Sequence, residues 1–273
     1  MAIKHRTEPN FLGICQSITL TAPMRACGKI DISHWNLAHN YLKQGLLLEA
    51  LHQFSVRFAT VVAKNSDLTY RYLPVMVEQF FSTAHFDSDR LRVEGHIERI
   101  NEAYRIHCKA SPYGNGRAVI AQVIIMVSKV YFLMVSKACF LSSCSEKAAL
   151  PLLGDLCKIS SVTGDSCTFS FNAHHPLFEE HFPSRAVCPG SLLIEMVLAL
   201  ATQGRAKNIA SVALKKVKFI EAVYPGNTYQ LTIKQDTECE PGGVFYIHTE
   251  TKKRSTCGKF SIKYKKEDAP CLT

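Results

Sequence analysis

One carboxylate stands inside an apolar run in the second half of the sequence. From Leu192 to Ala201, every residue except Glu195 is apolar. A helix made from this run is apolar on every side, so it must be buried and must bury Glu195 with it. A buried carboxylate is costly unless a partner or a reaction uses it. The run therefore predicts a buried helix that carries a functional glutamate.

The residues before this run indicate where the helix begins. Pro189 and Gly190 directly precede the apolar residues, and proline favours the first position of a helix. His181 lies fourteen residues before Glu195, across a loop that Pro183 also constrains. Because histidine titrates near neutral pH, it can accept a proton during a reaction. We therefore predict that His181 and Glu195 act together at the helix start. The structural alternative is that His181 caps a turn while Glu195 is a satisfied core carboxylate.

The length and composition indicate a globular protein of two domains. The chain has 273 residues, of which 47% are hydrophobic and 20% are charged. Residues Met1 to Asn10 lack the apolar core of a secretion signal. The longest apolar run, Ala118 to Val135, is interrupted by Lys129 and is shorter than the roughly 20 residues that a membrane-spanning helix needs. We expect a cytoplasmic protein without a membrane span.

Neither the cysteines nor the histidines form a recognisable ligand pattern. The eleven cysteines are odd in number and scattered, with no CxxC pair, so we expect reduced and mostly buried thiols. The eleven histidines include no HExxH motif. We therefore predict no metal site and no cofactor.

The net charge of +9 comes partly from a basic stretch near the C-terminus. We interpret this stretch as a strand edge that lysines protect from pairing. A docking surface for an anionic carrier protein or for a CoA phosphate stays open as the alternative. Nucleic acid is not expected as a partner, because no basic run is interleaved with stacking aromatics. The basic residues of the stretch are Lys252, Lys253, Arg254, Lys259, Lys263, Lys265 and Lys266, and Lys215, Lys216 and Lys218 form a separate group.

The chain states one pattern twice, with a boundary expected near residues 142–149. In each half we expect a strand, then an apolar helical segment with one glutamate, and then a series of strand-like stretches; Gly45 to Leu51, with Glu49, echoes Gly190 to Met196. We expect domains 1–145 and 146–273, each an α+β unit in which an antiparallel sheet covers the helix. The expected strands are 74–81, 90–100, 103–111 and 117–127 in the first half, and 209–223, 228–235, 244–250 and 259–265 in the second.

The segment HFPSRAVCPGSLLIE, from His181 to Glu195, resembles the active-site signature of the hotdog-fold 3-hydroxyacyl-ACP dehydratases of fatty acid synthesis, where ACP is the acyl carrier protein. The later KFIEAVYPGNTYQLTI, residues 218–233, also resembles a strand and a Pro-Gly turn of that family. The resemblance covers about 163–265. It departs from the family at four positions, which usually hold Gly, Pro and two apolar residues and are Ser184, Ala186, Cys188 and Ser191 here.

This resemblance implies a role for each residue of the motif. His181 would take the proton beside the thioester carbonyl, and Glu195 would protonate or orient the leaving hydroxyl. The backbone N–H of Gly190 would polarise the carbonyl at the positive end of the helix, with Pro189 and Phe182 also at the substrate. In the family, the His and Glu of one site come from different hotdog units. The resemblance therefore implies a homo-oligomer through hotdog pairing, or a pair within the chain.

The first half resembles a second hotdog group. DISHWNLAHNYLKQGLLLE, from Asp31 to Glu49, is similar to the 4-hydroxybenzoyl-CoA thioesterase family in its Asp31 and its Tyr41-Leu42 pair, although His34 replaces a usual glycine. The similarity covers about 18–127. It implies that Asp31 acts as base or nucleophile on the thioester, with Glu49 as second carboxylate. The alternative is a first half that keeps only the fold and completes the dehydratase site, with Glu49 facing His181.

Together these features predict a tandem hotdog that dehydrates 3-hydroxyacyl thioesters of ACP or CoA to trans-2-enoyl thioesters. Hydrolysis of acyl thioesters by the first half would be an additional activity. Two other functions stay open: a non-catalytic acyl-thioester-binding or assembly protein, and an enoyl-CoA hydratase that uses the same residues in reverse.

Overall fold

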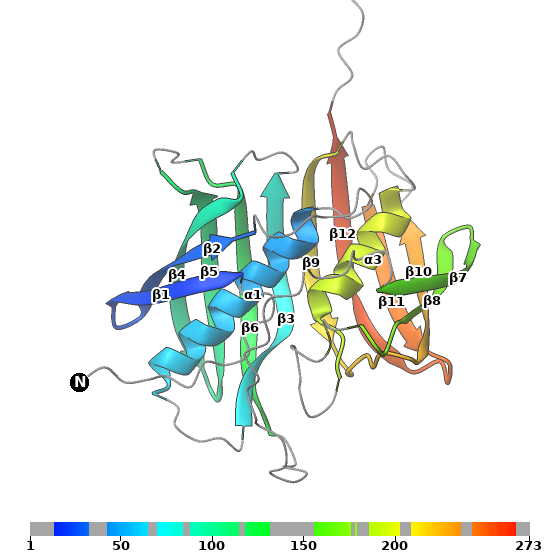
Figure 1. The fold of residues 1–273 in the computed structure, drawn as a ribbon, viewed down its shortest axis with the longest axis horizontal. Coiled ribbons are helices and arrows are strands. Elements are labelled where there is room, and N and C mark those ends of the chain that lie inside the picture. Colours follow the sequence, from blue (N-terminus) through cyan, green and yellow to red (C-terminus); the bar gives the residue numbers. More distant parts are fainter. Residues whose placement is uncertain are drawn as a thin grey trace, which may run out of the picture.

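A twelve-stranded antiparallel sheet organises the chain (Figure 1). The computed structural model describes residues 14–32, 43–64, 70–83, 88–114, 118–131, 156–175, 178, 186–202, 209–235 and 242–265. The first half contributes β1 (Cys15–Ala22), β2 (Arg25–Asp31), β3 (Tyr70–Thr83), β4 (Arg90–Ile100), β5 (Ala103–Pro112) and β6 (Ala121–Tyr131). The second half contributes β7 (Cys157–Thr163), β8 (Ser166–Phe171), β9 (Ile209–Phe219), β10 (Thr228–Gln235), β11 (Gly242–Thr249) and β12 (Arg254–Tyr264).

The strand order is mirrored about the middle of the sheet. The order is β1-β2-β4-β5-β6-β3-β9-β12-β11-β10-β8-β7, so each half places its strands in the same sequence outward from the central β3–β9 pair. This central pair is antiparallel, with Phe80 opposite Leu214. The two halves of the chain therefore share one continuous sheet.

Two helices lie across one face of this sheet, one over each half (Figure 1). They are α1 (Lys43–Val62) and α3 (Gly190–Thr202). The face of α1 that holds Leu47, Leu51, Phe54 and Phe58 is fully buried, at the spacing of an amphipathic helix. A Cβ at Gly95 would lie 2.6 Å from the ring of Phe54, so glycine lets the helix pack closely on β4.

Alternation along the strands produces the two faces of the sheet. In β4 the residues at 91, 93, 95 and 97 are buried, whereas those at 90, 92, 94 and 96 are exposed. This period of two places apolar side chains under the helices and polar side chains on the outer face. The α+β class, with a large antiparallel sheet and few helices, is confirmed. None of the described helices is long and apolar enough to cross a membrane.

The structure corrects the interpretation of the basic C-terminal stretch. β12 carries Arg254, Lys259 and Lys263, and it pairs with β9 on one side and with β11 on the other. The interpretation as a protected edge was wrong, because the strand lies inside the sheet and its lysines project from the outer face. The expected domain boundary at 145/146 lies outside the described residues.

Candidate active site

The two helices contact each other, and each carries one buried glutamate. Glu49 belongs to α1 and is 6% exposed, and Glu195 belongs to α3 and is 3% exposed. Each glutamate lies against the first turn of the other helix. The glutamates are therefore exchanged between the two halves of the chain.

Glu49 is held at the start of α3 by hydrogen bonds to both of its oxygens. Ser191, the second residue of α3, donates its hydroxyl to Oε2 over 2.6 Å. Gln53, one turn after Glu49 on α1, donates its amide to Oε1 over 3.0 Å. Because one donor comes from each half, the carboxylate is fixed in orientation beside the first turn of α3.

The electrostatics of Cys188 also place Glu49 at this helix start. Cys188 lies two residues before α3 and is buried. Burial raises the pKa of its thiol well above the ordinary value, and the charges of Cys157 and then Glu49 raise it further. The thiol donates to the carbonyl of Pro189 over 3.5 Å, and the Cys188 N–H donates to the carbonyl of Val223 over 2.8 Å. The Cys188 N–H thus fixes the residues before α3 to the segment that follows β9.

Glu195 packs on Gly45 in the first turn of α1. A Cβ at Gly45 would overlap Oε2 of Glu195 and lie 3.1 Å from its Cδ. Gly45 precedes Glu49 by four residues, as Ser191 precedes Glu195. Equivalent positions of the two helices therefore contact the glutamate of the other helix. Ser191 donates a hydroxyl to Glu49, whereas Gly45 has no side chain and leaves room for the Glu195 carboxylate.

Two aromatic rings border the start of α3. A Cβ at Gly190 would lie 2.5 Å from the ring of Phe219, so this glycine is required by packing against β9. The Phe219 ring stands edge-on to His52 of α1, with 6.0 Å between ring centroids. His52 is buried, 5% exposed. Neither residue was predicted as a site residue: His52 belongs to no motif, and the segment that holds Phe219, residues 218–233, was noted only for its strand and its Pro-Gly turn.

The other predicted site residues either are held by the sheet or lie outside the described residues. His181 and Phe182 are in the second group. Asp31 ends β2 and is 5% exposed; its Oδ2 accepts hydrogen bonds from Gln16 over 3.3 Å and from Arg90 over 3.2 Å. The sheet therefore holds this carboxylate through β1 and β4.

The two side chains that donate hydrogen bonds to Glu49, Ser191 and Gln53, were also not predicted as site residues. Ser191 was noted only as a departure from the family pattern, and Gln53 carried the signal of lying four residues after Glu49. Among the described residues, no three or more His, Cys, Asp or Glu side chains are grouped as metal ligands.

Comparison with known proteins finds similarity to dehydratases in the second half. Residues 160–260 match the family model of the ApeI-like dehydratases, described as ApeI dehydratase. The second half resembles a hotdog dehydratase. A curated relative, the 3-hydroxyacyl-(acyl-carrier-protein) dehydratase FabZ of Rickettsia felis, is 34% identical over 89 residues, which are 32% of this chain and 56% of the relative. The chain spans about half the length of the curated relatives it matches.

Solved structures share the fold over both halves. An acyl-ACP thioesterase from Bacteroides thetaiotaomicron has a TM-score of 0.57 at 10% identity and covers 88% of this chain and 98% of its own. The bifunctional dehydratase-cyclase domain of ambruticin biosynthesis has a TM-score of 0.52 at 10% identity, with coverage of 92% and 95%. At these identities the likeness shows the fold alone, which is the hotdog fold.

Proposed function

We infer that the chain is a tandem hotdog, two units fused near residues 145/146 and paired with each other. The mirrored strand order, and the helix that the structure describes in each half, support this arrangement. The two hotdog units then pair with each other within one chain, through the β3–β9 ladder and the contact of α1 with α3. Association into a homo-oligomer stays a prediction.

We propose that this chain dehydrates 3-hydroxyacyl thioesters at the start of α3. The observation that carries the proposal is the hydrogen bond from Ser191 to Glu49. It brings a carboxylate of the first half to the part of the second half that matches a dehydratase family. A composite of two hotdog units is the arrangement that the resemblance implies for such a site.

The proposed chemistry uses one histidine and one carboxylate. His181 precedes Gly190 by nine residues, so it belongs to the segment leading into α3. His181 takes the proton beside the carbonyl, and the Gly190 N–H at the positive end of α3 stabilises the enolate-like oxygen. Glu49 orients the 3-hydroxyl by accepting its hydrogen bond. The proton on His181 then passes to the departing hydroxyl, so that water and the enoyl thioester leave.

The identity of the acidic partner separates two versions of this proposal. Glu195 was the expected partner of His181, but its carboxylate lies at Gly45, against the start of α1. Glu49 lies beside the helix that His181 precedes. We therefore assign the partner role to Glu49 and keep Glu195 as the competing assignment.

A substrate panel tests the proposed activity. The chain is incubated with 3-hydroxyacyl and saturated acyl thioesters of ACP and CoA, and enoyl formation and free thiol are measured separately. We expect the wild type to form the enoyl product and His181→Ala to form none. Free thiol without enoyl product would instead show hydrolysis, and absence of both products would favour the non-catalytic binding protein. Rates from enoyl-CoA in the reverse direction decide between dehydratase and hydratase.

A further inference from the structure

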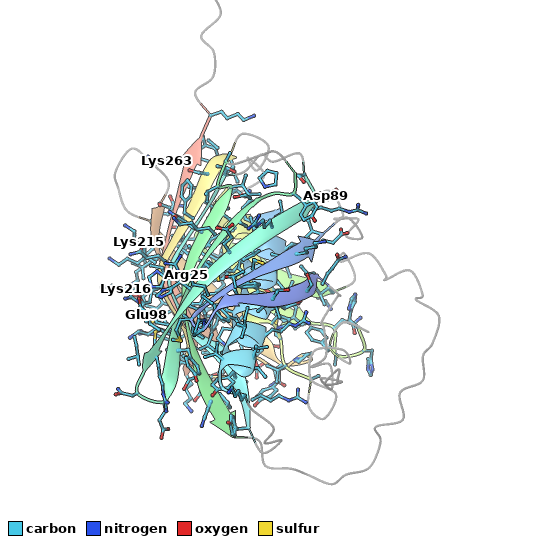
Figure 2. All side chains as sticks on the ribbon, turned by 90° about the vertical axis from the view of Figure 1, so that its left-hand side faces the viewer. Arg25, Asp89, Glu98, Lys215, Lys216 and Lys263 are labelled. Carbon is cyan, nitrogen blue, oxygen red and sulfur yellow. The ribbon has the colours of Figure 1, made fainter. Side chains whose placement is uncertain are left out.

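The outer face of the second half of the sheet carries basic side chains without acidic neighbours in its strands. This face lies opposite α1 and α3 (Figure 1). Strand β7 contains one Lys, β9 three, β10 one, and β12 two Lys and one Arg, whereas none of the strands β7 to β12 contains Asp or Glu. Figure 2 shows Lys215, Lys216 and Lys263 along one side of the molecule. We call the exposed basic residues of β9, β10 and β12 the basic platform: Lys215, Lys216, Lys218, Lys234, Arg254, Lys259 and Lys263.

The outer face of the first half is different, because acidic side chains offset its basic ones. Oε2 of Glu78 lies 2.7 Å from Nη2 of Arg105, and Oε1 of Glu94 lies 2.9 Å from Nη2 of Arg92. Glu98 adds a third carboxylate, within 4.0 Å of two histidines of the same face. In the second half, the positive charge of the platform has no such counterpart among the strand residues.

Two lysines of the platform stand in an unfavourable arrangement. Lys215 of β9 is directly opposite Lys259 of β12, and both are exposed. Like charges at such a cross-strand position destabilise a sheet. Among the described residues, no ion pair joins either lysine to a carboxylate. A bound anion would relieve this repulsion.

A bulge in β9 adds a third cation at the same place. Lys216 has a φ of 52°, a left-handed conformation that is uncommon for a residue other than glycine. The register of β9 against β12 shifts here, so the consecutive Lys215 and Lys216 are both exposed. The backbone is therefore strained at a point where the charges are already unfavourable. Strain of this kind is typical of functional positions.

Aromatic rings lie within the platform, on the strand between β12 and β10. Tyr246 and His248 of β11 are half-buried, and their rings are stacked with an interplanar angle of 27° and 6.1 Å between centroids. The guanidinium of Arg254 lies over the Tyr246 ring at 4.6 Å, and Nζ of Lys234 lies 6.0 Å from the centroid of that ring. Burial and then the charge of Arg254 lower the pKa of His248, which keeps its ring neutral at neutral pH. The platform thus combines planar groups with positive charge.

The composition of the platform indicates which anionic partner it fits. Among the described residues, no large hydrophobic side chain of β9, β10, β11 or β12 is exposed. Insertion into a membrane surface and tight docking of a protein both use such side chains. Interfaces with nucleic acid are instead polar and rich in positive charge, and bases stack on aromatic rings and on guanidinium planes. The platform also faces away from α1 and the start of α3, so an acyl group could not enter the proposed site from it.

We propose that the basic platform binds single-stranded nucleic acid, with phosphates at its lysines and bases stacked beside Arg254, Tyr246 and His248. The sequence did not predict such a partner, because no basic run is interleaved with stacking aromatics along the chain. The sheet brings the two kinds of side chain together from four different strands. Arg254 and Lys263 lie nine residues apart on β12, a span of about 30 Å, which suits several nucleotides. This binding is independent of the proposed dehydration.

Binding of a labelled oligonucleotide by the full-length chain tests the proposal. The probe is a fluorescent oligouridine of about twelve nucleotides, and fluorescence anisotropy measures its affinity over a range of salt concentrations. We expect Lys215→Gln/Lys259→Gln to bind about tenfold more weakly at low salt. The slope of log affinity against log salt should also be shallower by about 1.4, because two phosphate contacts are lost. The matched control is Lys29→Gln/Lys158→Gln, which neutralises two exposed strand lysines outside the platform and should bind within about twofold of wild type.

The stacking part of the proposal has its own variants. Tyr246→Leu removes the ring but no charge, so we expect the affinity for oligouridine to fall about tenfold with an unchanged salt dependence. Tyr246→Phe keeps the ring and should bind as the wild type does. Inorganic polyphosphate has charge but no bases, so Tyr246→Leu should bind it as tightly as the wild type.

The outcomes separate this binding from the proposed activity. Equal affinity for oligouridine in Lys215→Gln/Lys259→Gln and the wild type would overturn the proposal, and so would undiminished affinity in Tyr246→Leu. If vesicles of anionic lipid bound to the platform and the oligonucleotide did not, the proposed partner would be wrong. Dehydration, measured in the same variants, should stay at the wild-type rate. Oligouridine binding that the platform variants lose, in a chain without dehydration, would support the platform and remove the activity.

Discussion

Glu49 receives one hydrogen bond from its own helix and one from the other half of the chain. A carboxylate fixed in this way does not need to reorganise when a substrate hydroxyl approaches. Its orientation depends on Ser191, the residue that departs from the apolar type usual in the resembled family. The function of Glu49 should therefore be sensitive to this one hydroxyl.

Replacement of Ser191 by alanine tests that dependence. In Ser191→Ala, Oε2 of Glu49 loses its donor, so we expect kcat for dehydration to fall about ten- to hundredfold with little change in KM. Ser191→Thr keeps a hydroxyl and should recover much of the rate. Ser55→Ala is the matched control, because it removes a buried hydroxyl from α1 that bonds to the Leu51 carbonyl. A Ser191→Ala enzyme with the wild-type kcat would show that the hydrogen bond has no catalytic role.

Gly45 gives a second test, in which the sign of the effect is diagnostic. In a helix, Gly→Ala is ordinarily stabilising by about 1 kcal/mol. Here the added methyl group would collide with the Glu195 carboxylate, so we expect Gly45→Ala to lower the free energy of unfolding by roughly 1–3 kcal/mol. In a Glu195→Ala background the same change should be stabilising. Urea unfolding of the four variants measures this cycle, and stabilisation in both backgrounds would rule out the contact.

Cys108 predicts how stability depends on alkaline pH. Burial raises the pKa of its thiol to about 12 in the folded chain, against an ordinary value of 9.0. Between pH 9 and pH 12 the folded state keeps the thiol proton that the unfolded state releases. The free energy of unfolding is therefore retained in full below pH 9 and falls as the pH rises from 9 toward 12. The loss at pH 10.5 is about 2 kcal/mol.

Comparison with Cys108→Ala isolates this contribution. The stability advantage of the wild type over the variant should be constant between pH 6 and pH 8 and should be about 2 kcal/mol smaller at pH 10.5. Urea unfolding at the three pH values measures it. An advantage that stayed constant up to pH 10.5 would refute the pKa shift.

At the scale of elements, local sequence pattern predicted strands better than their places in the sheet. The strands expected at 90–100 and 228–235 have the observed bounds, because their apolar and polar residues alternate with a period of two. Before the helix of each half one strand was expected, without bounds, and the structure places β1 and β2 before α1. The interior position of β12 depends on pairing with β9 and β11, residues distant in sequence, so lysine content alone wrongly suggested an edge.

Lys215 of β9 stands directly opposite Lys259 of β12, and both are exposed, which leads to a prediction for this strand pair. Lys259→Glu replaces repulsion with attraction across β9 and β12, so we expect the free energy of unfolding to rise by about 0.2–1 kcal/mol at low salt. Lys158→Glu on β7 provides the same charge change away from this pair. Thermal or urea unfolding measures both variants. If Lys259→Glu were less stable than Lys158→Glu, the two lysines would not be repelling each other.

At the scale of the whole molecule, the candidate site depends on how the halves pair. The sequence showed that Glu49 and Glu195 are unusual, because each stands in an apolar helical segment. It left open which glutamate faces which helix start, since that depends on the contacts of Glu49 with Ser191 and of Glu195 with Gly45, whose residues lie 142 and 150 positions apart in the chain. The structure resolves this exchange through the β3–β9 seam and the crossing of α1 with α3. Ser191 and Gln53 became meaningful only once that crossing was known.

The most direct measurement compares Glu49→Gln with Glu195→Gln in a dehydration assay on a 3-hydroxyacyl thioester, with His181→Ala as the reference for a lost base. Both glutamine variants remove one buried carboxylate, so they are matched in burial and in charge. We predict that Glu49→Gln lowers kcat by about a hundredfold or more, because the carboxylate that orients the 3-hydroxyl is lost. In Glu195→Gln, kcat should stay within tenfold of the wild type. Wild-type turnover in Glu49→Gln, with activity abolished in Glu195→Gln, would contradict the composite site.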